Sequence, residues 1–175
     1  MDINNAVGEI QSLMRTNSRH LPFPLAITAQ NIEYYCQEFV RTGFTSRYLL
    51  LKNLIDFVEV YAKFVSVVYL SECRAICASP GNQEMFLKIR QALVDSKQAR
   101  RKISYSLGDW LAIAEMAAKT LGHFTDKMVF PELINLVIDD PGKKKSKRID
   151  AFADVCNNIV SIRNKRLGHG YVNES

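Results

Sequence analysis

The chain has 175 residues, of which 47% are hydrophobic, and its mean hydropathy of −0.09 is typical of a soluble domain with its own core. A formal net charge of +5 permits nucleic acid as a partner without demanding it. The four cysteines are scattered, and residues 1–5 lack the basic start and apolar run of a secretory leader. We therefore expect reduced cysteines in a cytoplasmic protein.

The start of the chain predicts a helical extension over residues 1–43. Apolar side chains recur every three or four residues over residues 2–17, which indicates an amphipathic helix. Pro22 and Pro24 then interrupt the pattern, because neither proline suits a helix interior. Thr28 is a candidate N-cap for a second helix.

The longest predicted helix covers residues 46–77. Its apolar residues spread over most of the circumference, which is typical of a helix packed on several sides. Four charged residues interrupt them at helical spacing: Lys52, Asp56, Glu59 and Lys63. These charges exclude a membrane span and predict ion pairs between successive turns. We expect this helix to form the axis of the fold.

The rest of the chain predicts further helices and no strands. Helical periodicity marks three more segments and a last helix, at residues 83–103, 110–121, 130–138 and from Ile149 onward. Asp109 is a candidate cap for the segment at 110–121. The sequence predicts an all-α fold, a bundle of about six or seven helices around the long one. We expect a single domain over residues 1–175, with its core at 44–171.

Residues 139–148 are the clearest loop in the sequence. They combine proline, glycine and five cations, and nothing in them is suited to a core. Lys144 and Lys145 are candidate contacts to the phosphate backbone of RNA. A solvated loop without a ligand has the same composition, so both interpretations stay open.

The stretch from Ile162 to Tyr171 carries most of the chemistry. It follows the last predicted helix, whose apolar stripe places Arg163 on the inner face or at its edge. A guanidinium there needs an acid or a phosphate as its partner. Gly168 and Gly170 flank His169 and allow a turn that folds the imidazole back toward Arg163.

Arg163-Asn164 followed by His169 resembles the motif of the HEPN superfamily, an arginine and a polar residue followed within a few residues by histidine. The resemblance implies RNA cleavage without a metal ion, with two copies of the motif facing each other across a homodimer. It implies that Arg163 clamps phosphate, Asn164 orients it and His169 acts as acid or base. Arginine suits phosphate and histidine titrates near neutral pH. Lys165 and Arg166 add charge for the substrate or for the helix end.

Two further motifs extend this resemblance. His169-Gly170-Tyr171 is similar to the His-x-Tyr ending of HEPN toxins that pair with a minimal nucleotidyltransferase antitoxin, in which the tyrosine becomes nucleotidylated. Tyr171 is therefore a candidate modification site, and an antitoxin or partner domain is a candidate partner. Ser106-Leu107-Gly108-Asp109-Trp110 looks like a segment that precedes the motif in HEPN-like domains of larger bacterial proteins. The resemblance implies a bacterial toxin or antiviral defence setting.

Other chemistries lack their motifs. The sequence contains no P-loop, no dinucleotide-binding glycine motif and no His-Glu-x-x-His. Cys73 and Cys77 lie one helical turn apart, but without a second pair of ligands we expect core cysteines. The sequence therefore predicts neither a metal nor a cofactor.

A non-catalytic function is the alternative. Arg163 to His169 is also consistent with a capped helix end, in which an internal acid such as Glu59 pairs with Arg163. In a catalytic site, Asp56 or Glu59 would instead orient Arg163 or His169. In the non-catalytic alternative, the chain would be a HEPN-like module for dimerisation or protein interaction within a larger multidomain bacterial protein. The small basic excess favours this alternative. So does the end of the chain four residues after Tyr171, which leads us to expect one domain of a longer protein.

Overall fold

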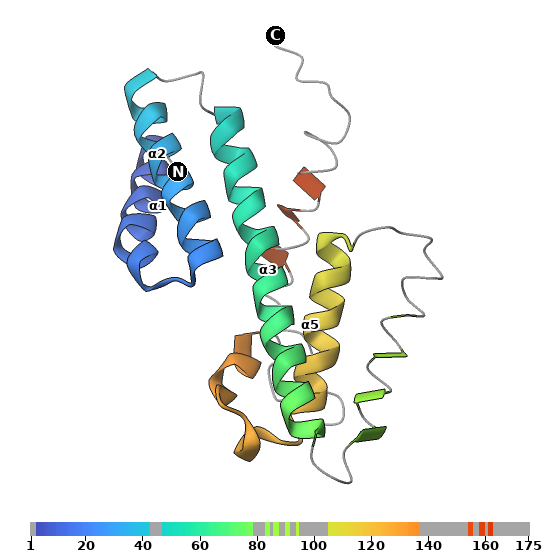
Figure 1. The fold of residues 1–175 in the computed structure, drawn as a ribbon. Helices are drawn as coiled ribbons and strands as arrows, with labels where there is room; N and C mark the ends of the chain where they lie inside the picture. The colour runs from blue at the N-terminus through green and yellow to red at the C-terminus, as the bar shows by residue number, and fades with distance from the viewer. Residues whose placement is uncertain are drawn as a thin grey trace. The chain divides into compact units, whose positions relative to one another are not determined.

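The structure, a computed structural model, is built from helices (Figure 1). It describes residues 3–42, 47–78, 83–84, 86–87, 90–91, 94, 105–136, 154–155, 158–159 and 161–162. These residues contain no strand, so the predicted all-α class is confirmed for them. None of the helices in this part of the chain is long and apolar enough to cross a membrane.

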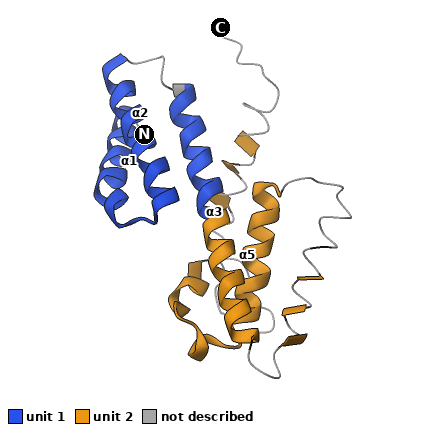
Figure 2. Ribbon diagram, viewed as in Figure 1, with its two compact units in different colours: residues 1–61 blue, residues 62–175 orange. Residues whose placement is uncertain are grey.

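The chain divides into two compact units, Met1–Tyr61 and Ala62–Ser175 (Figure 2). The boundary falls inside helix α3, Arg47–Cys77, in the stretch where the sequence predicts the longest helix. α3 therefore gives its first half to unit 1 and its second half to unit 2. The predicted division into an extension and a core stays a prediction, and the basic loop at 139–148 lies outside the described residues.

Unit 1 packs α1 and α2 with the first half of α3 around one apolar cluster. α1 spans Ile3–Asn17, the 3-10 turn η1 spans Ser18–His20, and α2 spans Phe23–Thr42. The cluster takes side chains from all three helices: Val7, Met14, Ala29, Ile32, Cys36, Phe39 and Leu50. Its α2 members recur every three or four residues, so they share one face of that helix. Each large apolar side chain buried there stabilises the fold by about 1.5–3 kcal/mol.

α2 begins earlier than the sequence predicts. A start at Thr28 is wrong, because the helix begins at Phe23 with Pro24 inside its first turn. Proline is tolerated there, since the first amides of a helix have no partner within it. The Pro22 carbonyl accepts a hydrogen bond from the Leu25 amide at 2.9 Å. The Thr28 hydroxyl instead donates back to the Leu25 carbonyl at 3.0 Å, inside the helix.

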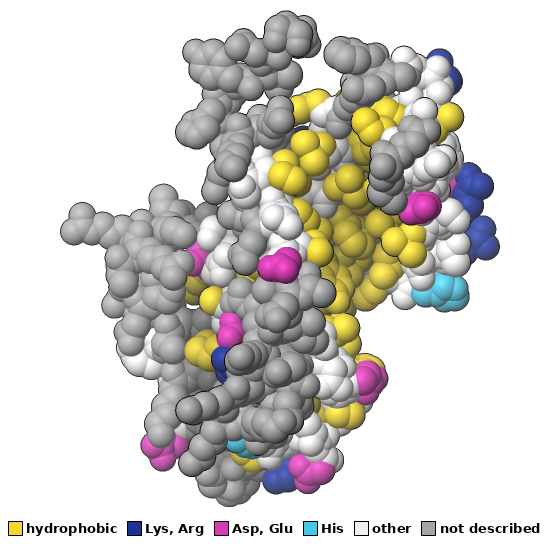
Figure 3. All heavy atoms as spheres, turned by 180° about the vertical axis from the view of Figure 1, so that it is seen from behind, with side chains coloured by type: hydrophobic (Ala, Val, Ile, Leu, Met, Phe, Trp, Pro, Cys, Tyr) yellow, Lys and Arg dark blue, Asp and Glu magenta, His cyan; other side chains and the backbone are white. Residues whose placement is uncertain are grey.

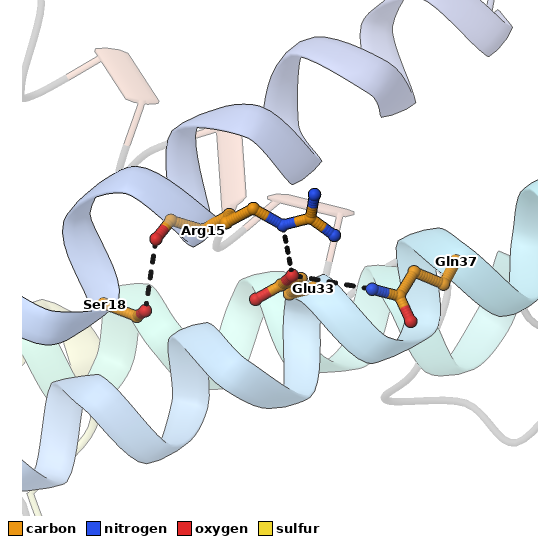
Figure 4. Close-up of polar contacts among 4 residues, drawn as sticks. All are labelled: Arg15, Ser18, Glu33 and Gln37. Atoms are coloured by element: carbon orange, nitrogen blue, oxygen red, sulfur yellow. Dashed lines mark hydrogen bonds and ion pairs between the residues drawn. The ribbon is translucent and has the colours of Figure 1, made fainter.

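A polar contact joins α1 to α2 (Figure 4). Arg15 Nε donates to Glu33 Oε1 at 2.8 Å, and Gln37 Nε2 lies 3.5 Å from the same oxygen. Ser18 Oγ lies 3.5 Å from the Arg15 carbonyl oxygen, in the turn after α1. The Arg15 side chain is 66% exposed, so solvent screens the ion pair, and such pairs contribute about 1 kcal/mol or less. Apolar burial is therefore the main source of stability in unit 1.

Unit 2 packs α5, Leu107–Leu121, alongside the second half of α3 (Figure 1). Ser66 Oγ lies 2.8 Å from the Trp110 carbonyl oxygen, and Cys73 Sγ lies 3.9 Å from the carbonyl oxygen of Ala117. Side chains of α3 thus reach the backbone of α5, which requires a close approach of the two helices. Small buried side chains on α5 permit that approach: Ala114, Ala117 and Ala118.

Two 3-10 turns follow α5, η2 at Thr125–Lys127 and η3 at Pro131–Leu136. The sequence predicts an α-helix over residues 130–138, and the structure has η3 there instead. Tyr69, which is fully buried on α3, donates its hydroxyl hydrogen to the Leu133 carbonyl. This hydrogen bond connects η3 to the buried face of α3.

The three described cysteines are free and buried: Cys36, Cys73 and Cys77. Burial raises the pKa of Cys73 to about 12, and the nearby Cys77 and Glu72 add smaller contributions in the same direction. Burial likewise raises the pKa of Cys36 to about 11, with a further contribution from Glu33. The folded chain therefore favours the neutral thiol at both positions.

We predict that the free energy of unfolding decreases as the pH rises above the ordinary thiol pKa of 9.0. Between pH 9.0 and about 12, Cys73 ionises in the unfolded chain but stays neutral in the folded chain. The stability that depends on the neutral Cys73 thiol is fully present below pH 9.0. It decreases by about 1.4 kcal/mol per pH unit as the pH rises from 9.0 to about 12. Urea unfolding at about pH 8 and about pH 10.5 measures the loss. Cys73→Ala should lose less stability between these two pH values, and equal losses would contradict the prediction.

Candidate functional site

The predicted catalytic and substrate-binding residues lie outside the described part of the chain: Arg163, Asn164, Lys165, Arg166, His169, Lys144 and Lys145, together with Tyr171. Just before the motif, residues 154–155, 158–159 and 161–162 are helical. They fall in the stretch where the sequence predicts the last helix. That helix is thus observed at these six positions, and the roles of the motif residues stay predictions.

The second motif, residues 106–110, is described in full and forms the start of α5. Ser106 is the N-cap, and its hydroxyl oxygen accepts a hydrogen bond from the Asp109 amide at 3.3 Å. Asp109 Oδ2 accepts in return from the Ser106 amide at 2.8 Å. The two residues therefore form a capping box, which gives partners to two amides at the helix start. Asp109 is not the cap that the sequence suggests but the third residue of α5, which begins at Leu107.

Asp109 is a buried acid, and one of its carboxylate oxygens accepts two hydrogen bonds. The residue is only 4% exposed, and Oδ2 also accepts from the Ser106 hydroxyl at 2.6 Å. The positive end of the α5 dipole favours a negative charge in this first turn. Gly108 lies between Ser106 and Asp109, and there is room for a side chain at this position. An added Cβ would meet only Ser106 Oγ, at 3.9 Å. The geometry indicates a structural role for this motif.

Trp110 connects the capping box to α3. Its ring lies edge-on to that of Tyr105, with 5.3 Å between the ring centroids. Its carbonyl oxygen lies 2.8 Å from Ser66 Oγ, and the Ala62 carbonyl oxygen lies 2.7 Å from the same hydroxyl. One hydroxyl donates one hydrogen, so Ser66 bonds either its own helix or α5 at a given moment. When the hydroxyl donates to the Trp110 carbonyl, it links the start of α5 to α3.

The charged residues of α3 form the helix-spaced pairing that the sequence predicts, at least in part. Lys52 Nζ lies 3.6 Å from Asp56 Oδ2, one turn further along the helix. Both side chains are about half exposed, so the pair adds little stability. Glu59 and Lys63 also have interaction partners. The hypothesis that Asp56 or Glu59 orients Arg163 or His169 concerns residues outside the described ranges and stays a prediction.

Glu72 is a buried acid that belongs to none of the sequence motifs. It is 7% exposed, and Oε2 accepts a hydrogen bond from the Val129 amide at 3.3 Å. It thereby links α3 to the segment between η2 and η3. The signal available in the sequence is its position: Glu72 lies three residues after Tyr69 and four before Ile76, both buried on α3. A carboxylate in such a stripe needs a partner, and here it finds a backbone amide.

The cysteine pair lies in the core, as the sequence indicates. Cys73 and Cys77 are both buried, and Cys73 Sγ is directed at a carbonyl oxygen of α5. Within the described ranges, no three histidine, cysteine, aspartate or glutamate side chains are grouped so that they could hold a metal ion.

We predict that Ser106→Ala and Asp109→Ala each destabilise the protein, by about 1 kcal/mol for the lost cap and more for the buried acid. The double variant should lose less than the two single losses added together, because both changes remove the same interaction. Urea unfolding measures all three. Gly108→Ala is the matched control in the same turn, and it should not destabilise. Strictly additive losses would contradict the capping box.

Three comparisons with known proteins leave the function to be inferred from the chain itself. No protein-family model, no curated protein and no solved structure matches it. The likeness to HEPN proteins therefore depends on the short motifs alone and supports a proposal about function, not a family assignment.

Proposed function

We propose that this protein is a metal-independent endoribonuclease of the HEPN type, with a composite site of Arg163, Asn164 and His169 from two chains of a homodimer. The observation that carries the proposal is the spacing of these residues after a helix in an all-α chain. The helical state of residues 154–155, 158–159 and 161–162 supports a helix that leads to the motif.

The proposed reaction is a transfer within the RNA strand. The 2′-oxygen attacks the adjacent phosphorus, the bond to the 5′-oxygen breaks, and a cyclic phosphate is left. The imidazole of His169 in one subunit takes the 2′-hydroxyl proton, and that of the other subunit protonates the leaving oxygen. Arg163 binds the phosphate oxygens as charge develops on them, and Asn164 orients the phosphate. Two chains therefore supply the acid and the base that a single motif cannot supply together.

The surrounding residues complete the proposal. Lys165 and Arg166 beside the motif, with Lys144 and Lys145 of the basic loop, contact the RNA backbone. The fold is a bundle of about six or seven helices in one domain, with α3 as its central helix. The setting is a cytoplasmic toxin or antiviral defence system, in which an antitoxin or partner domain restrains the enzyme and Tyr171 is the modification site.

We predict that the protein cleaves RNA in the presence of EDTA. His169→Ala should lower the rate by about 10²–10⁴-fold and Arg163→Ala by about 10²–10³-fold, because acid-base transfer and charge stabilisation contribute these factors. The measurement is the rate of cleavage of a labelled RNA by each purified variant, with circular dichroism to show that each is folded.

Two control variants show whether a loss of RNA cleavage is specific to the motif residues. His123→Ala removes another histidine, exposed in the turn after α5, and Arg19→Gln removes an exposed cation of η1. Both should cleave at the parent rate. A folded parent without activity, or activity that survives in His169→Ala, would exclude the proposed mechanism.

One structural observation favours the second candidate, a non-catalytic module for dimerisation or protein interaction. Phe23, Ile27 and Tyr34 are 76%, 42% and 56% exposed, and their spacing places them on one side of α2. That side is opposite the face buried in unit 1 through Ile32 and Cys36. Apolar side chains also gather at the surface in the view of Figure 3. These three exposed apolar side chains are candidate contacts for an interaction surface on α2.

We predict for this second candidate that Ile27→Glu weakens self-association by about 100-fold, because a charge in an apolar contact loses its hydration. Sedimentation of the parent and the variant over a range of concentrations measures the change. Ile3→Glu is the matched control, since Ile3 is also more than half exposed but lies on α1. A dimer that tolerates both substitutions equally would exclude this side of α2 as the contact.

A further inference from the structure

A hollow of ≈ 310 Å³ lies at the C-terminal end of α3, within unit 2. Among the described residues, its lining consists of Arg74, Cys77, Ala78, Gln83, Phe86 and Leu87. The volume is at the lower end of the range for small-molecule sites, about 300–1,000 Å³. The described lining residues belong to α3 and to positions 83–87, not to the proposed nuclease motif, so a ligand held by these residues does not depend on the nuclease proposal.

The lining comes from two triplets with the same spacing. Arg74, Cys77 and Ala78 occupy positions i, i+3 and i+4 at the end of α3, so they share one face of the helix. The helical residues 83, 86 and 87 repeat this spacing with Gln83, Phe86 and Leu87. Each triplet has one polar residue followed by two apolar ones. The hollow is therefore mainly apolar, and Arg74 and Gln83 are the two polar residues among its described lining.

Arg74 is the charged residue among the described lining of the hollow. It is exposed, and no carboxylate within the described residues pairs with it. The last carbonyls of α3 carry partial negative charge nearby, which stabilises the guanidinium and disfavours a ligand with several negative charges. A single carboxylate matches one guanidinium in charge and in planar geometry. The apolar side chains then require an aliphatic or aryl body on the same ligand.

We propose that this hollow binds a small monocarboxylate with a short aliphatic or aryl body. The carboxylate pairs with Arg74 and accepts from the Gln83 amide, and the body packs on Cys77, Phe86 and Leu87. A second hollow shares Leu87 but has both Glu84 and Arg90 in its lining, so its charges do not select an anion.

Isothermal titration calorimetry of the full chain with octanoate tests the proposal. We expect saturable binding in the millimolar range, about −4 kcal/mol. Arg74→Gln should weaken it by about tenfold or more, since it removes a charge-assisted hydrogen bond. Ala78→Glu places a carboxylate one turn from Arg74, where it competes for the guanidinium, and should abolish binding. Arg19→Gln removes a cation from unit 1 and should leave the affinity unchanged.

Octanamide, a neutral ligand of the same chain length, separates charge recognition from apolar adsorption. It should bind at least about tenfold more weakly than octanoate, and Arg74→Gln should not alter its affinity. Absence of saturable octanoate binding, equal affinity in a folded Arg74→Gln variant, or equal affinity for the two ligands would each overturn the proposal. Circular dichroism of every variant shows whether a loss of binding comes from unfolding, which we do not expect because Arg74 and Ala78 are exposed.

Discussion

α3 contributes buried side chains to both compact units. This one helix supplies Leu50 to the cluster of unit 1, and Tyr69 and Cys73 to the core of unit 2. A helix that is apolar over most of its circumference is stable in water only when other elements cover it. In unit 2, small buried alanines allow α5 to approach α3 closely. The Leu133 carbonyl of η3 accepts a hydrogen bond from Tyr69 of α3.

Three buried polar residues at these contacts, Ser66, Glu72 and Asp109, each have a hydrogen-bond partner, which indicates structural roles. Ser106 and Asp109 form reciprocal hydrogen bonds at the start of α5. The Ser66 hydroxyl on α3 lies within hydrogen-bond distance of the Trp110 carbonyl in the same turn. Glu72 is bonded to the Val129 amide. Groups whose hydrogen bonds are already used are poor candidates for binding or moving a substrate proton. The chemistry that we propose therefore depends on the motif after the last helix, and Ser106 to Trp110 position a helix.

Periodicity predicted the helices well where an apolar face is long. It predicted poorly the start of α2 and the type of helix after Phe130. Residues 46–77 carry a continuous apolar pattern, and α3 occupies Arg47–Cys77. The predicted start of α2 was too late because proline is tolerated in the first turn of a helix. The amide hydrogen that proline lacks would have no hydrogen-bond partner within the helix at that position. The short segment after Phe130 forms a 3-10 turn, and one of its carbonyls accepts a hydrogen bond from a tyrosine 64 positions away in the chain. No pattern within that segment reports such a distant partner.

The sequence by itself determined the all-helical class, the core role of Cys73 and Cys77, and the one spacing that indicates chemistry, Arg163-Asn164 to His169. These follow from residue type and period, which are local properties. Only the tertiary structure decided that Ser106 rather than Asp109 caps α5 and that Glu72 bonds a backbone amide. Only the tertiary structure also showed that Arg74 borders an apolar hollow. Each of these depends on which segments meet in space, because a hydrogen bond or a cavity needs both of its sides.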